Sequence, residues 1–230
     1  MSYESTLASV ETYFDKTATT KWERLTSDAP VSKIRETVRK GRDQMRDQLR
    51  SRLPGDLHGD LHGVRILDAG CGTGQMAVEL AMYGADVVAV DISPSLIDIA
   101  RQRMPQDLHS RITFQAGDML SKELGHFDHV IAMDSLIYYS AHDLAEALDG
   151  LAARTRESVL FTVAPRTPML MAMWYVGKLF PRSDRSPTMV PHTASRLSKA
   201  LFDRRSAAHL RPLERITSGF YISQAMELTP

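Results

Sequence analysis

The stretch of residues 64–74, VRILDAGCGTG, decides the fold of this 230-residue chain. It opens on a short apolar run that is typical of a buried strand. Asp68 follows the run, and every second residue after Ala69 is a glycine. Glycine lets the backbone turn sharply and lets a ligand approach the main chain closely. The sequence therefore predicts a strand, a tight ligand-binding turn and, over about residues 73–83, a helix whose first amides face the turn.

The spacing of the glycines indicates which ligand this turn holds. A dinucleotide-binding turn needs the pattern G-x-G-x-x-G, but Gln75 stands where its third glycine would fall. The pattern is instead D-x-G-x-G-x-G, which resembles the loop of class I methyltransferases. That resemblance implies S-adenosylmethionine as the cofactor, and an acid suits its zwitterionic methionine end. A structural turn without a ligand is the alternative. The loop residues assigned to the cofactor are Asp68, Gly70, Cys71, Gly72 and Gly74.

Acidic residues also follow the next predicted strands. Asp91 ends a strand over residues 86–90, and a carboxylate at that position can accept hydrogen bonds from both ribose hydroxyls. The alternative for Asp91 is to cap the helix that starts at Ser93 and Pro94. The strand over 111–115 leads to an acid expected at the adenine amino group, and the strand over 127–133 leads to a segment expected over the reacting methyl. These further cofactor assignments are Ile92, Asp118, Met119 and Asp134.

Strands and helices alternate from residue 64 to residue 163, which predicts an α/β fold with a parallel sheet and crossover helices. A fifth strand is expected over 158–163 and a helix over 193–202, with Thr193 as its N-cap. Residues 213–216 and 220–228 fit a hairpin that turns at Ser218 and Gly219. Such an antiparallel hairpin would complete the seven-stranded, Rossmann-like sheet of class I methyltransferases.

Three segments of one domain are expected: an N-terminal helical arm (1–53), a cofactor-binding core (54–165) and a substrate-side insert with the helix and hairpin (166–230). The arm contains predicted helices over 2–14 and 33–53, the second capped by Ser32. The many arginines of the second helix suit either a solvated face with internal ion pairs, such as Arg39 with Asp43, or anion binding. The Met-rich residues 169–176 suit either a core helix or a surface for a large flat apolar ligand.

Charge is distributed unevenly although the net charge is zero. Residues 1–53 carry 11 basic and 8 acidic side chains, residues 54–165 carry 7 and 16, and residues 166–230 carry 10 and 4. Basic flanks around an acidic core favour an anionic substrate held by the flanks, with chance asymmetry as the alternative. The balanced total charge and the lack of an N/D-P-P-Y-type motif argue against a nucleic-acid substrate.

Cysteine usage and hydropathy bear on the compartment. The single cysteine excludes an internal disulfide and fits a reducing compartment. Cys71 is expected to pack beneath the cofactor, because a nucleophilic role needs a base nearby. No signal peptide is visible, and no apolar run approaches the roughly 20 residues of a membrane span. We therefore expect a cytoplasmic protein with at most peripheral membrane contact. No metal site is expected, because His58 and His62 share a stretch with Gly59 and Gly63 that predicts a loop.

Four motifs give a more specific resemblance. They are YFDKTA at 13–18 with WER at 22–24, the glycine loop, DSLIYY at 134–139 and FPRSDRSP at 180–187. Over most of its length the chain resembles the magnesium-protoporphyrin IX O-methyltransferases of chlorophyll and bacteriochlorophyll synthesis. The resemblance implies methylation of one propionate of magnesium protoporphyrin IX, with S-adenosylhomocysteine as the second product. It also implies an encounter with the large subunit of magnesium chelatase.

The resemblance also implies which residues surround the acceptor. Many relatives carry a histidine, considered catalytic, where this chain has Tyr138. A propionate is already ionised at neutral pH, so the protein needs to desolvate and orient it rather than deprotonate it. Tyr13 is expected to close the arm over the site, and Tyr138 and Tyr139 to orient the acceptor. The residues expected at the porphyrin are Trp174, Arg182 and Arg185, with His192 as an axial ligand of magnesium or a structural histidine.

Other functions remain open from the sequence. A methyltransferase of another small molecule, such as a quinol, would use the same core but would need a base for its phenolic acceptor. A non-catalytic porphyrin carrier would tolerate damage to the cofactor loop, which is intact here. A dinucleotide-dependent oxidoreductase is disfavoured by the glycine spacing.

Overall fold

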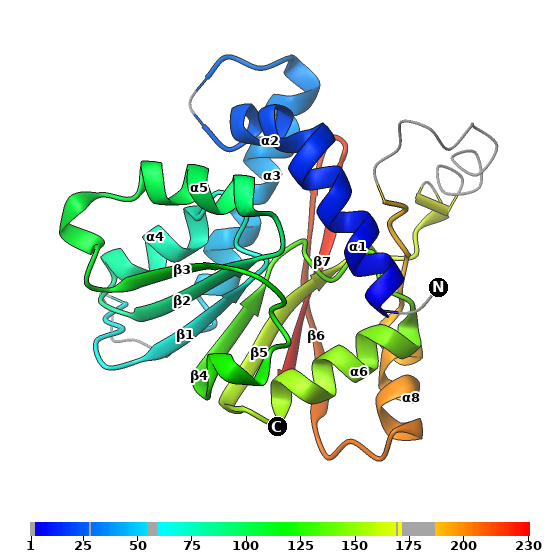
Figure 1. The fold of residues 1–230 in the computed structure, drawn as a ribbon. Coiled ribbons are helices and arrows are strands. Elements are labelled where there is room, and N and C mark those ends of the chain that lie inside the picture. The colour runs from blue at the N-terminus through cyan, green and yellow to red at the C-terminus, as the bar shows by residue number, and fades with distance from the viewer. Residues whose placement is uncertain (1–2, 28, 55–58, 169, 172–186) are drawn as a thin grey trace.

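The structure is a computed structural model that describes residues 3–27, 29–54, 59–168, 170–171 and 187–230 (Figure 1). Its centre is a seven-stranded sheet with the strand order β3-β2-β1-β4-β5-β7-β6. Strands β1 to β5 pair in parallel, and β7 pairs antiparallel with both β5 and β6. The strands are β1 Arg65–Ala69, β2 Asp86–Asp91, β3 Ile112–Ala116, β4 Phe127–Ala132, β5 Thr155–Val163, β6 His209–Ser218 and β7 Tyr221–Thr229. The predicted Rossmann-like methyltransferase sheet is confirmed.

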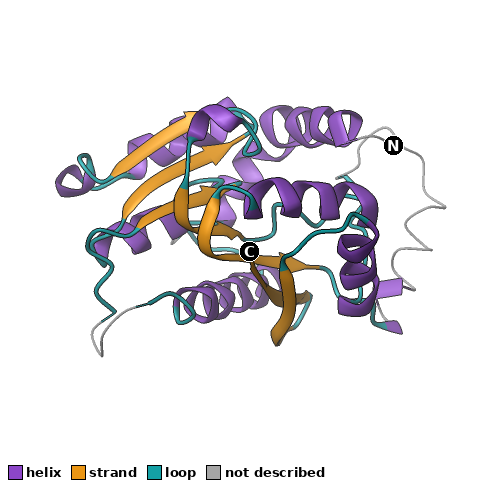
Figure 2. Cartoon of the chain, turned by 90° about the horizontal axis from the view of Figure 1, so that it is seen from below, coloured by secondary structure: helices purple, strands orange, loops and turns teal. Residues whose placement is uncertain are grey.

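Helices cover both faces of the sheet, as Figures 1 and 2 show. On one face, buried side chains of α3, α4 and α5 pack in one hydrophobic cluster; on the other, α6 and α8 pack in a second. Parallel strands need such crossover helices, because the chain must return to the same end of the sheet before each new strand begins. These helices are α3 Lys33–Arg50, α4 Gln75–Met82, α5 Pro94–Arg103, α6 Ala141–Ala152 and α8 Ala194–Asp203. Short 3-10 turns lie at η2 Gln106–Leu108 and η3 Lys122–Leu124.

Local signals of capping and turning are confirmed. The side chains of Ser32, Ser93 and Thr193 each accept a hydrogen bond from an amide in the first turn of α3, α5 and α8. The hairpin of β6 and β7 turns at Gly219, whose φ of 57° lies in the left-handed region that favours glycine. An added Cβ at that position would also lie 2.3 Å from Oγ1 of Thr37 in α3, so the turn packs closely on the arm.

The N-terminal arm contains more elements than the sequence indicated. A π-helical turn, η1 Phe14–Ala18, and a further helix, α2 Thr19–Leu25, follow α1 Tyr3–Tyr13. Within the turn, Thr19 Oγ1 donates to the carbonyls of Phe14 and Asp15. A threonine hydroxyl that bonds to the carbonyls of the preceding turn can bend a helix. The sequence shows no glycine or proline at this point from which a change of helix could be predicted. Helix α3 ends at Arg50, before the predicted residue 53.

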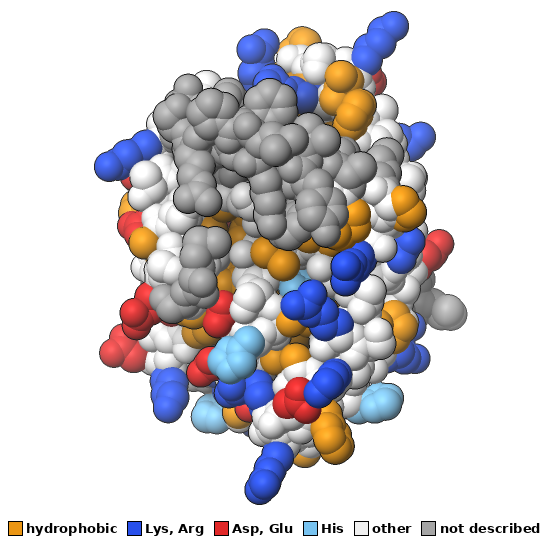
Figure 3. Space-filling model, turned by 90° about the vertical axis from the view of Figure 1, so that its right-hand side faces the viewer, with side chains coloured by type: hydrophobic (Ala, Val, Ile, Leu, Met, Phe, Trp, Pro, Cys, Tyr) orange, Lys and Arg blue, Asp and Glu red, His pale blue; other side chains and the backbone are white. Residues whose placement is uncertain are grey.

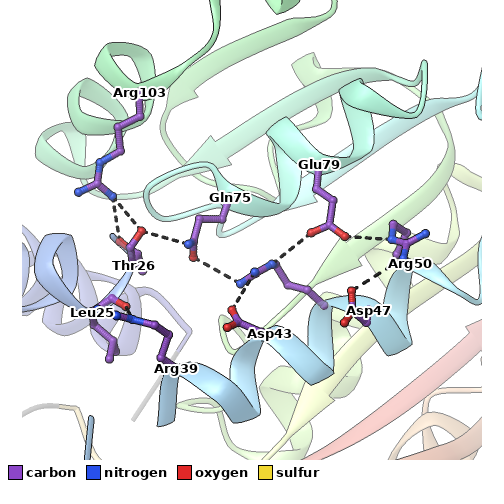
Figure 4. Close-up of polar contacts among 10 residues, drawn as sticks. Leu25, Thr26, Arg39, Asp43, Asp47, Arg50, Gln75, Glu79 and Arg103 are labelled. Atoms are coloured by element: carbon purple, nitrogen blue, oxygen red, sulfur yellow. Dashed lines mark hydrogen bonds and ion pairs between the residues drawn. The ribbon is translucent and has the colours of Figure 1, made fainter. Parts of the chain in front are cut away.

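The arginines of α3 make mostly internal contacts (Figure 4). The expected Arg39–Asp43 pair is wrong. Arg39 instead donates to the main-chain carbonyls of Arg24, Leu25 and Ala29, because the chain folds back after α2 and presents three acceptors there. The arginines of α3 form ion pairs with acids of several elements: Arg42 with Asp134, Arg46 with Asp43 and Glu79, and Arg50 with Asp47 and Glu79. Arg52, just beyond the helix, pairs with Glu227. Ion pairs thus account for the contacts of Arg46 and Arg50, but the Arg46 side chain is mostly buried and lines the cleft described below rather than a solvated face.

No helix within the described ranges has both the length and the apolar character needed to cross a bilayer.

Candidate functional site

A deep cleft lies between the carboxyl ends of β1, β2 and β4 and the N-terminal arm. Its empty space is about 880 Å³, including the part open to solvent. The arm lies above one end of the sheet in Figure 1, and it contributes apolar and aromatic walls. The arm residues that line the cleft are Leu7, Val10, Phe14, Trp22, Thr26, Arg42 and Arg46. The predicted cofactor residues that line it are Asp68, Gly70, Cys71, Gly72, Asp91, Ile92, Met119 and Asp134.

The glycine loop is shaped by contacts on its outer side as well as by its backbone. Gly70 and Gly72 have φ values of 83° and 55°. An added Cβ on Gly70 would lie 2.3 Å from Cβ of Ser135, and one on Gly72 would lie 3.2 Å from Nε1 of Trp22. Gly74 faces Phe114 rather than the cleft, since its added Cβ would lie 2.8 Å from Cζ of that ring. The loop thus needs glycines both for its turns and for the side chains pressed against it.

Cys71 lies within this loop, where it is partly buried and lines the cleft. Burial raises its pKa well above the ordinary value, and the nearby carboxyls of Asp68 and Asp91 raise it further. A thiol with a raised pKa is a poor nucleophile because the thiolate is the reactive form. These surroundings favour the packing role predicted for Cys71.

Asp68 is the buried acid at the base of the cleft. Its Oδ2 atom has no hydrogen-bond partner among the described residues, although the side chain is almost fully buried. Burial first, and then the charge of Asp91, raise the pKa of Asp68 to about 7. A buried acceptor without a partner is costly, so it calls for a donor or cation supplied by a ligand. The ammonium group of a methionine moiety fits that requirement.

Asp91 is held by the backbone on both sides. Its Oδ2 accepts from the amide of Gly72 at 2.8 Å, and its Oδ1 accepts from the amide of Ser93 at 3.0 Å. Burial nevertheless raises its pKa, against the effect of these two amides. Ser93, not Asp91, is the N-cap of α5, and Asp91 accepts from the amide of that cap residue. Asp91 also lines the cleft, and its contact with a ribose stays a prediction.

The third acid, Asp118, lies in the loop after β3. Its neighbours Gly117 and Met119 line the cleft, whereas Asp118 itself is not among the lining residues, and its contact with adenine stays a prediction. Arg154 donates from behind to the carbonyls of Met119 and Ser121, which fixes the loop. Asp118 Oδ1 accepts from the amide of Leu120 at 2.8 Å.

Asp134 is largely occupied by protein donors. It accepts from Arg42 Nη1 at 2.5 Å, from the hydroxyl of Tyr221 at 3.2 Å and from Oγ1 of Thr162 at 3.0 Å. Its φ of 56° is unusual for a residue other than glycine. The guanidinium of Arg42 also stacks on Trp22, 4.8 Å from the ring centroid. Asp134 therefore positions Arg42 at the cleft wall, and a contact of Asp134 itself with the cofactor stays a prediction.

Of the three predicted tyrosines, two line the cleft and Tyr13 does not. Tyr138 and Tyr139 line it, and burial raises the pKa of both phenols well above the ordinary value. They therefore remain protonated and can donate hydrogen bonds but cannot serve as bases near neutral pH. Tyr13 packs edge-on against Phe14, which in turn packs edge-on against Tyr138. The arm thus connects Tyr13 to the cleft through one ring.

Of the predicted porphyrin contacts, the structure describes His192. Trp174, Arg182 and Arg185 fall outside the described residues. His192 is buried, and its Nε2 is 3.0 Å from the carbonyl of Tyr139. Burial lowers its pKa, so it is a neutral imidazole that donates this bond. That setting accounts for His192 as a structural histidine, and its role as a magnesium ligand stays a prediction.

Some residues at the cleft escaped the sequence analysis. Trp22 belongs to the quoted WER motif, and it covers Gly72. Thr26 Oγ1 accepts a hydrogen bond from Thr73 Oγ1 at 2.8 Å. The carbonyl of Thr26 accepts from Gln75 and Arg103 (Figure 4). Nothing in the sequence distinguishes Arg42 from the other arginines of its helix. Pairs so distant along the chain leave no local pattern, because contact depends on how the arm folds back.

Comparison with known proteins agrees with this geometry. A curated magnesium-protoporphyrin O-methyltransferase of Rhodobacter capsulatus is 54% identical over 222 residues, which cover 96% of this chain and 95% of the relative. The chain belongs to the magnesium-protoporphyrin O-methyltransferase family. The family model for the magnesium-protoporphyrin IX methyltransferase C-terminus matches residues 132–230, and a general methyltransferase domain matches residues 66–158.

A solved structure of this family is also similar. It is the magnesium protoporphyrin IX methyltransferase of Synechocystis PCC 6803 with bound S-adenosylhomocysteine, at 28% identity and a TM-score of 0.82. The match covers 96% of this chain and 97% of that one. The chloroplastic enzyme of Arabidopsis thaliana is 28% identical over 96% of this chain and 70% of its own length. The chain is accordingly an S-adenosylmethionine-dependent methyltransferase, and the predicted cofactor is confirmed.

Proposed function

We propose that the protein transfers a methyl group from S-adenosylmethionine to a propionate carboxylate of magnesium protoporphyrin IX, which gives the monomethyl ester and S-adenosylhomocysteine. The observation that carries the proposal is the chemistry of the acceptor end of the cleft. Among the described residues that line it there is no histidine or lysine, and its two phenols remain protonated. A cleft of this kind suits an acceptor that is already an anion, as the named substrate of the relatives is.

The reaction needs no proton transfer. The cofactor supplies a methyl carbon bonded to a sulfonium. An acceptor carboxylate oxygen forms the new bond to this carbon while the carbon–sulfur bond breaks and its electron pair stays on sulfur. The protein's task is to hold the two groups in line and to keep water away, which can contribute on the order of 7–11 kcal/mol.

Individual side chains are assigned within this scheme. Asp68 holds the ammonium end of the cofactor, and Asp91 and Asp118 hold the ribose and the adenine. Tyr138 and Tyr139 donate hydrogen bonds that orient the propionate, and the ring of Tyr13 supports them from the arm. From the sequence we assign Arg182 and Arg185 to the second propionate and Trp174 to the macrocycle.

The large subunit of magnesium chelatase is proposed as the partner that delivers the porphyrin, on the resemblance stated above. Peripheral membrane contact is the most that we propose, with the cytoplasm as the compartment. If the chelatase subunit delivers the substrate, adding it in purified form should raise the rate of methylation at limiting porphyrin. A rate that does not change would remove this part of the proposal.

The direct test is an acceptor assay with the purified chain and S-adenosylmethionine labelled in the methyl group. Magnesium protoporphyrin IX, its dimethyl ester, metal-free protoporphyrin and a catechol-type quinol serve as acceptors. We expect label in the monomethyl ester, one S-adenosylhomocysteine per ester, and no label with the dimethyl ester. Label in the quinol would indicate the alternative methyltransferase, and tight porphyrin binding without label would indicate a carrier.

The assigned side chains are tested in the same assay. Arg182→Ala and Tyr13→Ala should each lower kcat/KM for the porphyrin by roughly 10-fold, as expected for the loss of a hydrogen bond to a charged group or of an orienting ring contact. Lys40→Gln, on the exposed side of α3, is the control. If both variants matched the control, the assignment of these two residues would be wrong.

A further inference from the structure

The first residue of α1 contacts the loop that is expected to hold adenine. The hydroxyl of Tyr3 donates to Oδ1 of Asp118 at 2.8 Å, across 115 positions of sequence. Burial is the largest cause of a raised pKa at Tyr3, so the phenol remains protonated and continues to donate. None of the four motifs that carried the sequence analysis includes Tyr3.

The ring of Tyr3 is fixed independently of its hydroxyl. It stacks on the ring of Tyr139, with centroids 4.9 Å apart and an interplanar angle of 18°. Tyr139 is itself almost fully buried and lines the cleft. The stacked pair therefore holds the Tyr3 hydroxyl at a set position above the loop after β3.

The carboxylate of Asp118 is thereby restrained on one side. Oδ1 accepts both the Tyr3 hydroxyl and the amide of Leu120, each at 2.8 Å. Within the described residues Oδ2 accepts no hydrogen bond. A carboxylate has acceptor capacity on both oxygens, so two donors on Oδ1 fix its rotation and leave Oδ2 for a ligand. The rest of the loop is already held by Arg154 through the carbonyls of Met119 and Ser121, which leaves the Asp118 side chain as the part that Tyr3 steers.

We propose that Tyr3 is a positioning residue for cofactor recognition: its hydroxyl orients the Asp118 carboxylate so that Oδ2 accepts a hydrogen bond from the 6-amino group of adenine. The inference rests on the proposed assignment of Asp118 to adenine. It predicts discrimination against a 6-oxopurine, which presents an acceptor instead of a donor to this oxygen. A simple latch that holds α1 on the core would restrain the arm but would not distinguish the two purines.

The test compares two ligands that differ only at this position, S-adenosylhomocysteine and S-inosylhomocysteine, by titration calorimetry on the full chain. Tyr3→Phe keeps the stack on Tyr139 and removes only the hydroxyl. We expect it to weaken binding of the adenine ligand by roughly 2- to 12-fold, the range for one net hydrogen bond, and to leave the inosine ligand nearly unchanged. Tyr83→Phe is the matched control, because the Tyr83 ring packs under Arg50, outside the cleft.

Asp118→Ala provides the second arm of the experiment. In that background Tyr3→Phe should have no further effect on the adenine ligand, because its only route to the purine has been removed. Equal weakening of both ligands by Tyr3→Phe, no weakening of either, or an undiminished effect in the Asp118→Ala background would overturn the inference and indicate a latch or no role.

Two further outcomes separate this inference from the proposed function. If Asp118→Ala leaves the preference for adenine unchanged, the assignment of Asp118 and the role of Tyr3 both fail, while methylation of the porphyrin by the unaltered chain is unaffected. If the unaltered chain binds neither ligand, the cofactor assignment fails as well. Far-ultraviolet circular dichroism and the melting temperature establish that each variant is folded before it is titrated.

Discussion

At the scale of single residues, three carboxylates of the cleft differ in the partners that compensate their charge. Asp134 is paired with Arg42, Asp91 accepts two backbone amides, and Asp68 keeps one oxygen without a partner among the described residues. Burial favours the neutral form of a carboxyl, and each compensating donor opposes that effect. The least compensated acid is therefore the one whose protonation state a cationic ligand changes most.

This difference predicts a pH dependence that belongs to Asp68. An unfolded aspartate has a pKa near 3.9, while in the folded chain the pKa of Asp68 is about 7. Between these values the folded state keeps a proton that the unfolded state loses, so the free energy of unfolding of the cofactor-free protein falls as pH rises. Asp68→Asn lacks this loss, and its stability relative to the unaltered chain should improve by about 2 kcal/mol from pH 5 to pH 8. Urea unfolding at both pH values measures it.

The same substitution should weaken S-adenosylhomocysteine binding by roughly 10- to 100-fold at pH 8, because a hydrogen bond to a charged group is lost. In the unaltered chain the affinity should rise as pH increases through 7, since the ionised carboxylate is the form that binds an ammonium. A relative stability of Asp68→Asn that stays constant with pH would contradict the raised pKa.

The ion pair of Asp134 with Arg42 predicts a cost in stability when the carboxylate is removed. Asp134→Asn keeps a residue type that tolerates positive φ and keeps acceptors for Tyr221 and Thr162, but it leaves the mostly buried Arg42 without its counter-charge. Unpaired buried charges are costly, and we expect a loss of about 2–4 kcal/mol in urea unfolding. Asp203→Asn breaks the exposed pair with Lys199 and should cost less than about 1 kcal/mol. Equal losses in the two variants would show that the Arg42 pair is not special.

Residue-scale prediction from sequence succeeded where the signal was local. The acids at the ends of successive strands were placed by the alternation of strands and helices, and Asp68 and Asp91 line the cleft. Arg42 and Tyr3 were not recognised, because their partners lie 92 and 115 positions away. Nothing in the neighbourhood of an arginine indicates which distant carboxylate it meets.

At the scale of elements, the contact of α3 with β7 links the arm to the hairpin. Gly41 is buried in the middle of α3, and an added Cβ there would lie 2.5 Å from Cδ1 of Tyr221. Tyr221 in turn donates to Asp134. The helix therefore approaches the sheet at a glycine, and the hairpin supports the cleft through this approach.

Two glycine substitutions test this packing against intrinsic helix propensity. In a helix interior, glycine to alanine ordinarily gains about 1 kcal/mol. Gly150→Ala in α6, where the added Cβ meets nothing within 4 Å, should show a gain of that order. Gly41→Ala should instead lose about 1–3 kcal/mol, because the methyl displaces the Tyr221 ring. Thermal unfolding of both variants measures the difference, and a gain at both positions would contradict the close packing of α3 on β7.

Most elements were predictable because capping and turn residues act over three or four positions. Ser32, Ser93 and Thr193 mark helix starts, and Gly219 marks the hairpin. The exceptions lie in the arm. Helix α2 and the turn η1 follow α1 without a proline or glycine between them, so periodicity alone could not separate them.

At the scale of the whole molecule, the uneven charge of the three segments is partly balanced within the fold. Arginines of the basic arm pair with acids of the core, as Arg42 does with Asp134 and Arg50 with Glu79. On the face shown in Figure 3, basic side chains lie dispersed among acidic and apolar ones rather than in one patch. The uneven charge along the chain therefore reflects ion pairs between the segments as well as any binding of an anionic ligand.

These interlocking contacts predict cooperative unfolding of the arm with the core. Thr26 bonds to Thr73 and Gln75 at the glycine loop, and Asp15 accepts from Ser93 and Ser95 at the start of α5. Although 230 residues exceed the usual size of a two-state domain, we expect a single calorimetric transition. Two separated transitions, with the first removing helix signal only, would show that the arm unfolds independently.

The partial burial of Cys71 in the glycine loop has a practical consequence. Since the sequence holds one cysteine and its raised pKa keeps it in the unreactive form, the native chain should react slowly with maleimides. A cysteine introduced at an exposed position, such as that of Phe202 in α8, would then be modified selectively. Fluorescent dyes could be attached at chosen points without first removing the natural thiol, and the motions of this enzyme could be followed with its cofactor loop left intact.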